Sequence, residues 1–135
     1  MGYTDKHYTE VRKAQQKAYA PYSQFKVGAY LVTKDGQTFH GANVENAAYP
    51  SCICAERSAL VAAISQGYKP GDFESITITV DSPELASPCG PCRQVIHELC
   101  DDDMPVYMTN QTGEMREPTV AELLPYGFSG KDLNL

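Results

Sequence analysis

The sequence predicts an α/β domain with a mixed sheet, because helical and strand patterns alternate along its 135 residues. Apolar residues recur at helical spacing near the N-terminus, whereas residues 75–80 alternate apolar and polar side chains, as a strand with two unequal faces does. The Asp35-Gly36 pair between two apolar segments adds the signal of a β-hairpin. The expected order is α-β-β-α-β-α-β, with room for a last short strand and helix.

The N-terminal part is expected to begin with a helix over residues 5–20, which Pro21 ends. Two strands then follow over residues 26–33 and 38–44, joined by the hairpin turn. Residues 45–52 show no period, so we expect a loop there. This loop leads directly into a group of cysteines.

Helices and strands continue to alternate in the rest of the chain. We expect a helix over 54–66 closed by Gly67, a strand over 75–80, a loop over 81–88, a helix that begins at Cys89 or Gly90 and ends at Cys100, a strand over 105–109, a short helix over 119–124 and an irregular tail over 125–135. No repeat or linker interrupts this order, so a single domain over residues 1–135 is expected.

The composition is that of a globular protein, with 42% hydrophobic and 21% charged residues. A formal net charge of -6 disfavours a nucleic-acid partner, because an acidic surface repels phosphates. The sequence shows neither a secretory signal nor an apolar segment of membrane-spanning length, so we expect a cytoplasmic protein and no membrane partner. Five cysteines in a reducing compartment are to be read as metal ligands before disulfides.

Two cysteine groups, each at the predicted start of a helix, indicate a catalytic zinc site. Cys54 belongs to the first group, and Cys89 and Cys92 to the second. Three thiolates with one open position are typical of catalytic zinc, and Glu56 is then free to move protons. A helix N-terminus favours thiolates. Because three thiolates leave the centre negative, we hypothesise that the adjacent Arg57 compensates charge.

Other interpretations of these cysteines remain open on the residues alone. Cys52 could serve as a fourth ligand and close the site into a structural one, which would leave Glu56 without a role. Cys89 and Cys92 could form a redox pair, although the first cysteine group would then be unexplained. Cys100 falls near the far end of its helix and is expected in the core.

Five segments in this order and spacing resemble a known family over nearly the whole chain. They are APYSQFKVGA (20–29), NVENAAY (43–49), CAER (54–57), PCGPCRQ (88–94) and LPYGF (124–128). The sequence is similar to the small zinc-dependent cytidine deaminases of pyrimidine salvage, in which a non-ligating Glu accompanies the metal. A cysteine as first ligand, here Cys54, is the choice of the small homotetrameric branch.

The resemblance implies a three-layer α/β/α domain with a central mixed five-stranded sheet and one Zn²⁺ per subunit. It also implies hydrolytic deamination of cytidine and 2′-deoxycytidine to uridine and 2′-deoxyuridine, with release of ammonia. In that reaction Glu56 takes a proton from the zinc-bound water and passes it to ring N3. The hydroxide attacks C4, and Glu56 then protonates the departing amine.

The resemblance also assigns residues to the nucleoside. Asn43 and Glu45 would hold the ribose hydroxyls, and Glu45 would repel a 3′-phosphate. Phe25 would stack near the pyrimidine. Without the resemblance, Asn43 and Glu45 could equally be solvated groups at a hairpin end, and Phe25 could be a core aromatic.

The remaining residues that the resemblance assigns concern contacts between subunits and with the substrate. Ala55 is expected at the substrate, and Phe128 and the loop 46–49, including Tyr49, are expected to reach a neighbour's active site in a homotetramer.

Two further functions stay in view. One is deamination of another aminopyrimidine nucleoside or of cytosine in a nucleic acid, and the other is a non-catalytic zinc-stabilised binding module. The sequence does not choose between ribo- and deoxyribonucleosides, and it assigns no role to His7, His40 or His97.

Overall fold

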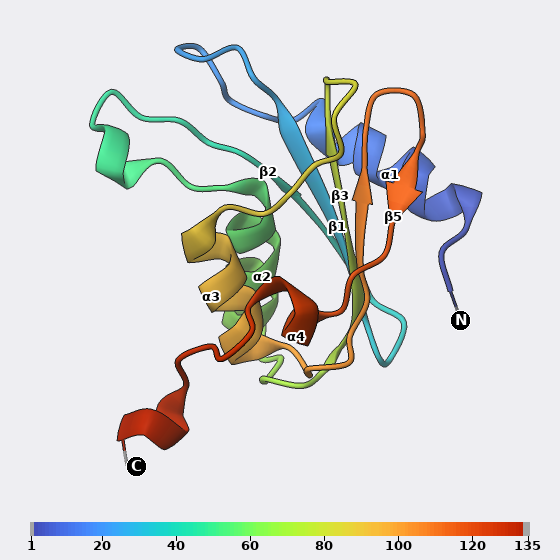
Figure 1. Ribbon diagram of the computed structural model, residues 1–135. Helices are drawn as coiled ribbons and strands as arrows, with labels where there is room; N and C mark the ends of the chain where they lie inside the picture. Colours follow the sequence, from blue (N-terminus) through green and yellow to red (C-terminus); the bar gives the residue numbers. More distant parts are fainter. Residues whose placement is uncertain (1, 134–135) are drawn as a thin grey trace.

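A mixed sheet of five strands separates two layers of helices in the computed structural model, which describes residues 2–133. Figure 1 shows α2 and α3 on one face and α1 on the other. The elements are α1 (Asp5–Gln15), β1 (Val27–Thr33), β2 (Thr38–Ala42), the short helix η1 (Tyr49–Ser51), α2 (Ala55–Ser65), β3 (Phe73–Val80), α3 (Gly90–Leu99), β4 (Val106–Thr109), β5 (Met115–Arg116), α4 (Val120–Leu123) and the short helix η2 (Gly130–Leu133).

The strand order is β2-β1-β3-β4-β5. Strand β1 pairs antiparallel with both β2 and β3, and β5 pairs antiparallel with β4. Strands β3 and β4 run parallel, which requires the chain to cross over through α3 before it re-enters the sheet. The predicted three-layer α/β/α architecture with a mixed five-stranded sheet is therefore confirmed.

The face covered by α2 and α3 is apolar. Leu31, Ile76 and Ile78 of the sheet are buried in one cluster with the small side chains of α2. Those small side chains let the helix lie close to the sheet, and Gly41 of β2 extends this close approach. A Cβ atom at Gly41 would lie 2.7 Å from the backbone nitrogen of Ala59.

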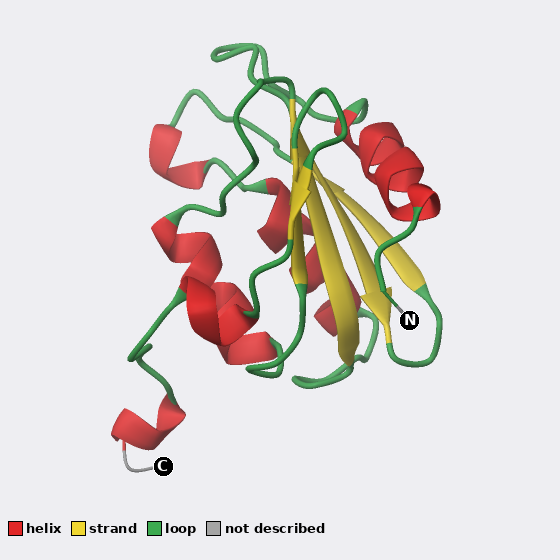
Figure 2. Cartoon of the chain, turned by 45° about the vertical axis from the view of Figure 1, so that its right-hand side comes forward, coloured by secondary structure: helices red, strands yellow, loops and turns green. Residues whose placement is uncertain are grey.

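The face covered by α1 is polar, although it is buried too. The strand β3 turns Ser75, Thr77 and Thr79 toward this side, and all three are 0–1% exposed. Rings of His7 and Tyr30 meet here with centroids 5.9 Å apart. Figure 2 shows α1 lying on its face of the sheet across from the other helices.

Two of the predicted elements end earlier in the structure than the sequence analysis expected. The first helix stops at Gln15 rather than at residue 20, because the backbone of Tyr19 leaves the helix to bond with Asn43 and Glu45. Its N–H donates to Asn43 O at 2.9 Å, and its carbonyl accepts from Glu45 N at 2.8 Å. Strand β2 correspondingly ends at Ala42 instead of residue 44.

Other differences are smaller. Strand β3 begins two residues earlier than expected, at Phe73. The last short strand is β5, and part of the predicted irregular tail forms η2. The final residues of that tail, 134–135, lie outside the described residues.

Candidate metal centre and substrate cavity

The three predicted metal ligands sit at the starts of two helices. Cys54 is the N-cap residue of α2 and Cys89 is the N-cap residue of α3, both in extended conformation. Cys92 follows in the first turn of α3. Because N-cap side chains point toward the open end of their helix, the two helix starts present these cysteines to a common point.

The sulfur atoms of these cysteines lie within 4.8 Å of one another. The Sγ atoms of Cys54 and Cys89 are 3.7 Å apart, and those of Cys89 and Cys92 are 3.3 Å apart. A tetrahedral zinc ion with bonds of about 2.3 Å requires its sulfur ligands to be about 3.8 Å apart. The cluster therefore fits one zinc ion and leaves its fourth ligand position open.

The crowding of these thiols affects their pKa values in opposite directions. Burial raises the pKa of Cys92 far above its ordinary value, and the Glu56 carboxylate and the neighbouring thiols raise it further. For Cys89, burial acts in the same direction, but hydrogen bonding with Cys92 and Cys54 outweighs it and lowers the pKa. Three crowded thiols can ionise together only if a positive charge lies among them.

Arg57 lies where the sequence analysis placed it. Its Nη2 donates to the sulfur of Cys54 at 3.3 Å. This hydrogen bond and the charge of the thiolate raise the pKa of Arg57. A fixed positive charge at this position offsets part of the negative charge of a three-thiolate centre.

Cys52 does not belong to the cluster. Its sulfur accepts a hydrogen bond from the backbone N–H of Asn46 at 3.3 Å, and the residue faces the cavity described below. The interpretation as a closed four-cysteine structural site is therefore not supported. Cys100 is 7% exposed and packs in the core, as expected.

Glu56 is a buried acid next to the sulfur cluster. It lies in the first turn of α2 and is only 4% exposed. Burial raises its pKa, which the charge of Arg57 and a hydrogen bond with Cys92 only partly oppose. A raised pKa makes a carboxyl group a better proton acceptor than a solvated one, which suits a general base that later returns the proton.

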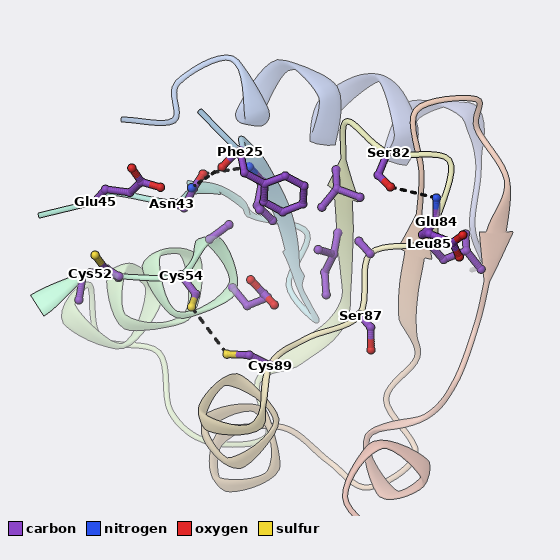
Figure 3. A pocket seen from close by; sticks show the side chains of 17 residues that line it. Phe25, Asn43, Glu45, Cys52, Cys54, Ser82, Glu84, Leu85, Ser87 and Cys89 are labelled. Atoms are coloured by element: carbon purple, nitrogen blue, oxygen red, sulfur yellow. Dashed lines mark hydrogen bonds between the residues drawn. The ribbon is translucent and has the colours of Figure 1, made fainter. Parts of the chain in front are cut away.

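A cavity of about 380 Å³ opens over these groups, within the usual size range of small-molecule sites. Figure 3 shows it between the cysteines and the loop that carries Ser82 and Leu85, with Phe25 at its upper side. Its walls come from the residues around β1 and β2, from α2 and from the loop after β3. They are Phe25, Val27, Asn43, Glu45, Cys52, Ile53, Cys54, Ala55, Glu56, Ile78, Val80, Ser82, Glu84, Leu85, Ala86, Ser87 and Cys89.

Asn43 and Glu45 both line this cavity, and hydrogen bonds fix both side chains. The amide of Asn43 accepts from Val27 N at 2.9 Å and donates to Phe25 O at 2.8 Å. The carboxylate of Glu45 accepts from the hydroxyl and backbone N–H of Ser23, which lowers its pKa. Glu45 is therefore a pre-oriented negative charge at the cavity and not a loosely solvated end of a hairpin.

The structure separates the other expected substrate contacts into two groups. Phe25 is 47% exposed at the cavity, so it is not a core aromatic, and Ala55 also lines the wall. Tyr49, 73% exposed, instead lines a second hollow of about 260 Å³. Phe128 is 55% exposed and does not line the main cavity of its own chain.

The loop after β3 forms a wall that the sequence analysis did not recognise. Ser82, Glu84, Leu85 and Ser87 line the cavity from this side. One signal could have found them: the loop leaves the carboxyl end of a strand that pairs in parallel with β4. Ligands of α/β proteins commonly bind at such strand ends.

Comparison with known proteins agrees with this geometry. Residues 1–108 match the family model described as the cytidine and deoxycytidylate deaminase zinc-binding region. The chain therefore belongs to the cytidine and deoxycytidylate deaminase family. Together with the sulfur cluster, this membership confirms the predictions of a deaminase and of a zinc cofactor.

Individual relatives match the chain over most of their length. The cytidine deaminase of Sporosarcina psychrophila is 48% identical over 96% of this chain and 94% of its own. A probable cytidine deaminase of Dictyostelium discoideum is 40% identical over 90% of this chain and 81% of its own. The crystal structure of cytidine deaminase from Burkholderia pseudomallei superposes with a TM-score of 0.91 at 46% identity, covering 94% of this chain and 100% of that one.

Among the described residues, no helix combines the length and the apolar character needed to cross a bilayer.

Proposed function

We propose that the protein is a cytidine deaminase of pyrimidine salvage, working in the cytoplasm as a single domain over residues 1–135. It hydrolyses cytidine and 2′-deoxycytidine to uridine and 2′-deoxyuridine and releases ammonia. The observation that carries this proposal is Glu56, a buried carboxyl group beside three clustered sulfur atoms at a cavity of nucleoside size. Relatives named cytidine deaminase support the choice of substrate.

Cys54, Cys89 and Cys92 would hold the zinc ion. When bound, zinc lowers the pKa of a coordinated water and so supplies a nucleophile at neutral pH. The chain's own contribution begins with Glu56, whose raised pKa suits it to take up the proton of that water. Glu56 delivers this proton to ring N3 and later protonates the departing amine at C4. Between these steps Glu56 takes up a second proton, from the hydroxyl group that the attack adds at C4, so one carboxyl group serves as base and as acid in both transfers.

The cavity walls suit a neutral nucleoside. Phe25 offers a ring face to the pyrimidine, and Ala55 leaves space beside it. Glu45 accepts a hydrogen bond from a ribose hydroxyl, assisted by Asn43. The described walls carry the carboxylates of Glu45 and Glu84 but no Lys, Arg or His, so a phosphate on the sugar would be repelled. This disfavours nucleotides and nucleic acids as substrates.

We further propose a homotetramer in which active sites are shared between subunits. Tyr49, Phe128 and Tyr19 are large apolar side chains that are each more than half exposed in the single chain. Exposed aromatic groups of this kind are typical of surfaces that a partner covers. In the tetramer, Tyr49 and Phe128 would contact the substrate in a neighbour's cavity. Dilution below the dissociation point should then abolish turnover, whereas active monomers would defeat this part of the proposal.

The decisive experiment is incubation of the purified protein with cytidine and 2′-deoxycytidine, followed by the ultraviolet change to the uracil product. A parallel zinc determination should give one ion per subunit. Cytosine in single-stranded DNA and other aminopyrimidine nucleosides complete the substrate set. Zinc binding without turnover of any substrate would favour a binding module instead.

A further inference from the structure

Arg93 makes three hydrogen bonds that surround the start of α3. Its Nε donates to Pro88 O at 2.8 Å, and its Nη2 donates to Ser87 Oγ at 2.6 Å. Its Nη1 donates to Leu123 O at 3.0 Å. Each of the three side-chain nitrogens therefore donates a hydrogen bond. None of these bonds goes to a sulfur atom of the cluster or to Asn43 or Glu45.

The two nearer acceptors belong to the segment that carries a metal ligand. Ser87 and Pro88 immediately precede Cys89, and both Ser87 and Cys89 line the cavity. Upstream, the backbone of Ala86 is held by Thr109 of β4, whose carbonyl accepts from Ala86 N at 2.9 Å. Between that anchor and the first turn of α3, Arg93 donates two hydrogen bonds to the chain, at Ser87 and Pro88. Figure 3 shows Ser87 on the segment that leads into Cys89.

The third acceptor links this segment to a distant part of the chain. Leu123 is the last residue of α4, and its carbonyl is one of those that a helix leaves without an internal partner. Arg93 thus ties the approach to Cys89 to the end of α4. Only the planar guanidinium group can reach three acceptors in fixed directions, since a lysine ammonium is a single point charge on a flexible stem.

We propose that Arg93 is a positioning residue for the metal centre, which fixes the direction in which Cys89 presents its sulfur. It differs from Arg57, which contacts a ligand sulfur directly, because it acts through the backbone and side chain of the preceding residues. Groups that orient metal ligands typically change metal affinity about 10- to 100-fold when they are removed. The inference rests on the zinc site of the proposed function and not on the identity of the substrate.

The test measures how fast the zinc-loaded protein loses its metal to a coloured chelator. We expect Arg93→Ala to release zinc at least about 10-fold faster than the unaltered protein, with Arg93→Lys in between. Ser87→Ala removes one of the three acceptors and should give a smaller increase. Arg116→Lys changes an exposed arginine of β5 and should release zinc at the unaltered rate.

A spectroscopic readout separates positioning from stability. With Co²⁺ in place of zinc, Arg93→Lys should shift the thiolate-to-cobalt absorption, whereas Arg116→Lys should not. Release rates within about 2-fold of the unaltered protein together with an unchanged cobalt spectrum would overturn the proposal, even if the melting temperature falls. If Arg93→Ala does not fold, Arg93→Lys decides. An unaltered protein that holds no zinc would instead defeat the proposed function.

Discussion

The two faces of the sheet are equally buried but chemically opposite. Along β3, Ile76 and Ile78 turn toward α2 and α3, whereas Thr77 and Thr79 turn toward α1. The metal cluster and the cavity lie on the apolar side. Both faces are buried, but the buried acid and the sulfur cluster lie only on the apolar side among the described residues, so burial alone does not make a site.

The apolar face supplies apolar surroundings to Glu56. With little water near it, its charge is poorly solvated, and electrostatic interactions with a bound substrate are stronger. On the polar face, the buried hydroxyl groups of Ser75, Thr77 and Thr79 have no hydrogen-bond partner among residues 2–133, and none of them is an acid. The carboxylate of Glu10 on α1 is only partly buried, and it binds both His40 and Lys13. These contacts engage the carboxylate of Glu10, which lines neither of the two hollows described above.

The largest difference in kcat is expected between substitutions of two carboxyl groups that lie on opposite faces of the sheet. Glu56→Gln should keep fold and zinc but lower kcat about 100- to 10,000-fold, because the proton carrier is lost. Glu10→Gln is the matched control and should leave kcat unchanged. Steady-state kinetics with cytidine and a zinc assay measure both. Unchanged turnover in Glu56→Gln would refute the proposed mechanism.

Two glycines give the second contrast, since each lies against a helix on a different face. A Cβ at Gly28 would come within 2.6 Å of Val11 O, and one at Gly41 within 2.7 Å of Ala59 N. Each change to alanine should lower the free energy of unfolding by about 2–3 kcal/mol, as overpacking does. Only Gly41→Ala should also lower kcat, because it pushes α2 away. Urea unfolding and kinetics test this, and equal losses of activity would contradict it.

Substitution of two buried threonines by valine should change the free energy of unfolding in opposite directions. Thr77 Oγ1 has no hydrogen-bond partner within residues 2–133, whereas Thr109 Oγ1 donates to Ile78 O at 2.7 Å. Thr77→Val removes an unsatisfied hydroxyl and should raise the free energy of unfolding by about 1 kcal/mol. Thr109→Val should lower it by a similar amount. A loss of stability in Thr77→Val would show that its hydroxyl is satisfied in solution.

The smallest effect concerns His7 and pH. Burial lowers the pKa of His7 below its ordinary value of 6.5, and its Nδ1 accepts from the backbone N–H of Thr4. The stability from the neutral ring is therefore complete above pH 6.5 and declines as the pH falls through the lowered pKa.

His7→Gln keeps a capping group but cannot titrate in this range, so its melting temperature should fall less between neutral and mildly acidic pH. Both proteins carry the same metal centre, so zinc loss at acidic pH affects them alike. Identical pH dependences would exclude His7 as the cause.

The sequence predicted those parts of the fold that depend on local pattern. The alternation over residues 75–80 marked both faces of β3 before any neighbour was known. The first helix was predicted too long because Ala18 keeps the helical spacing, while a contact between Tyr19 and the chain after β2 decides the conformation. Strand β5 has two residues, too few to show any period.

The residues of the site also divide into those that a local sequence pattern predicts and those that depend on distant contacts. Cys54, Glu56 and Cys89 could be identified because helix starts and short spacings lie within one stretch of chain. Arg93 could not, because its role depends on where α3 and α4 meet in space, and the only signal for the loop wall was its position after β3, a strand parallel to β4. Tyr49 and Phe128 stay predictions, since their expected contacts involve a neighbouring subunit.

The cavity has one wall that belongs to the core and one that does not. Ile78, Val80 and Ala55 hold the sheet and α2 together, so substitutions there disturb the metal centre as well. Glu84 of the opposite wall is exposed, lies outside the core cluster and makes none of the contacts of Arg93. Evolution, or a directed library, can therefore vary Glu84 to admit altered bases or sugars while the catalytic apparatus stays constant.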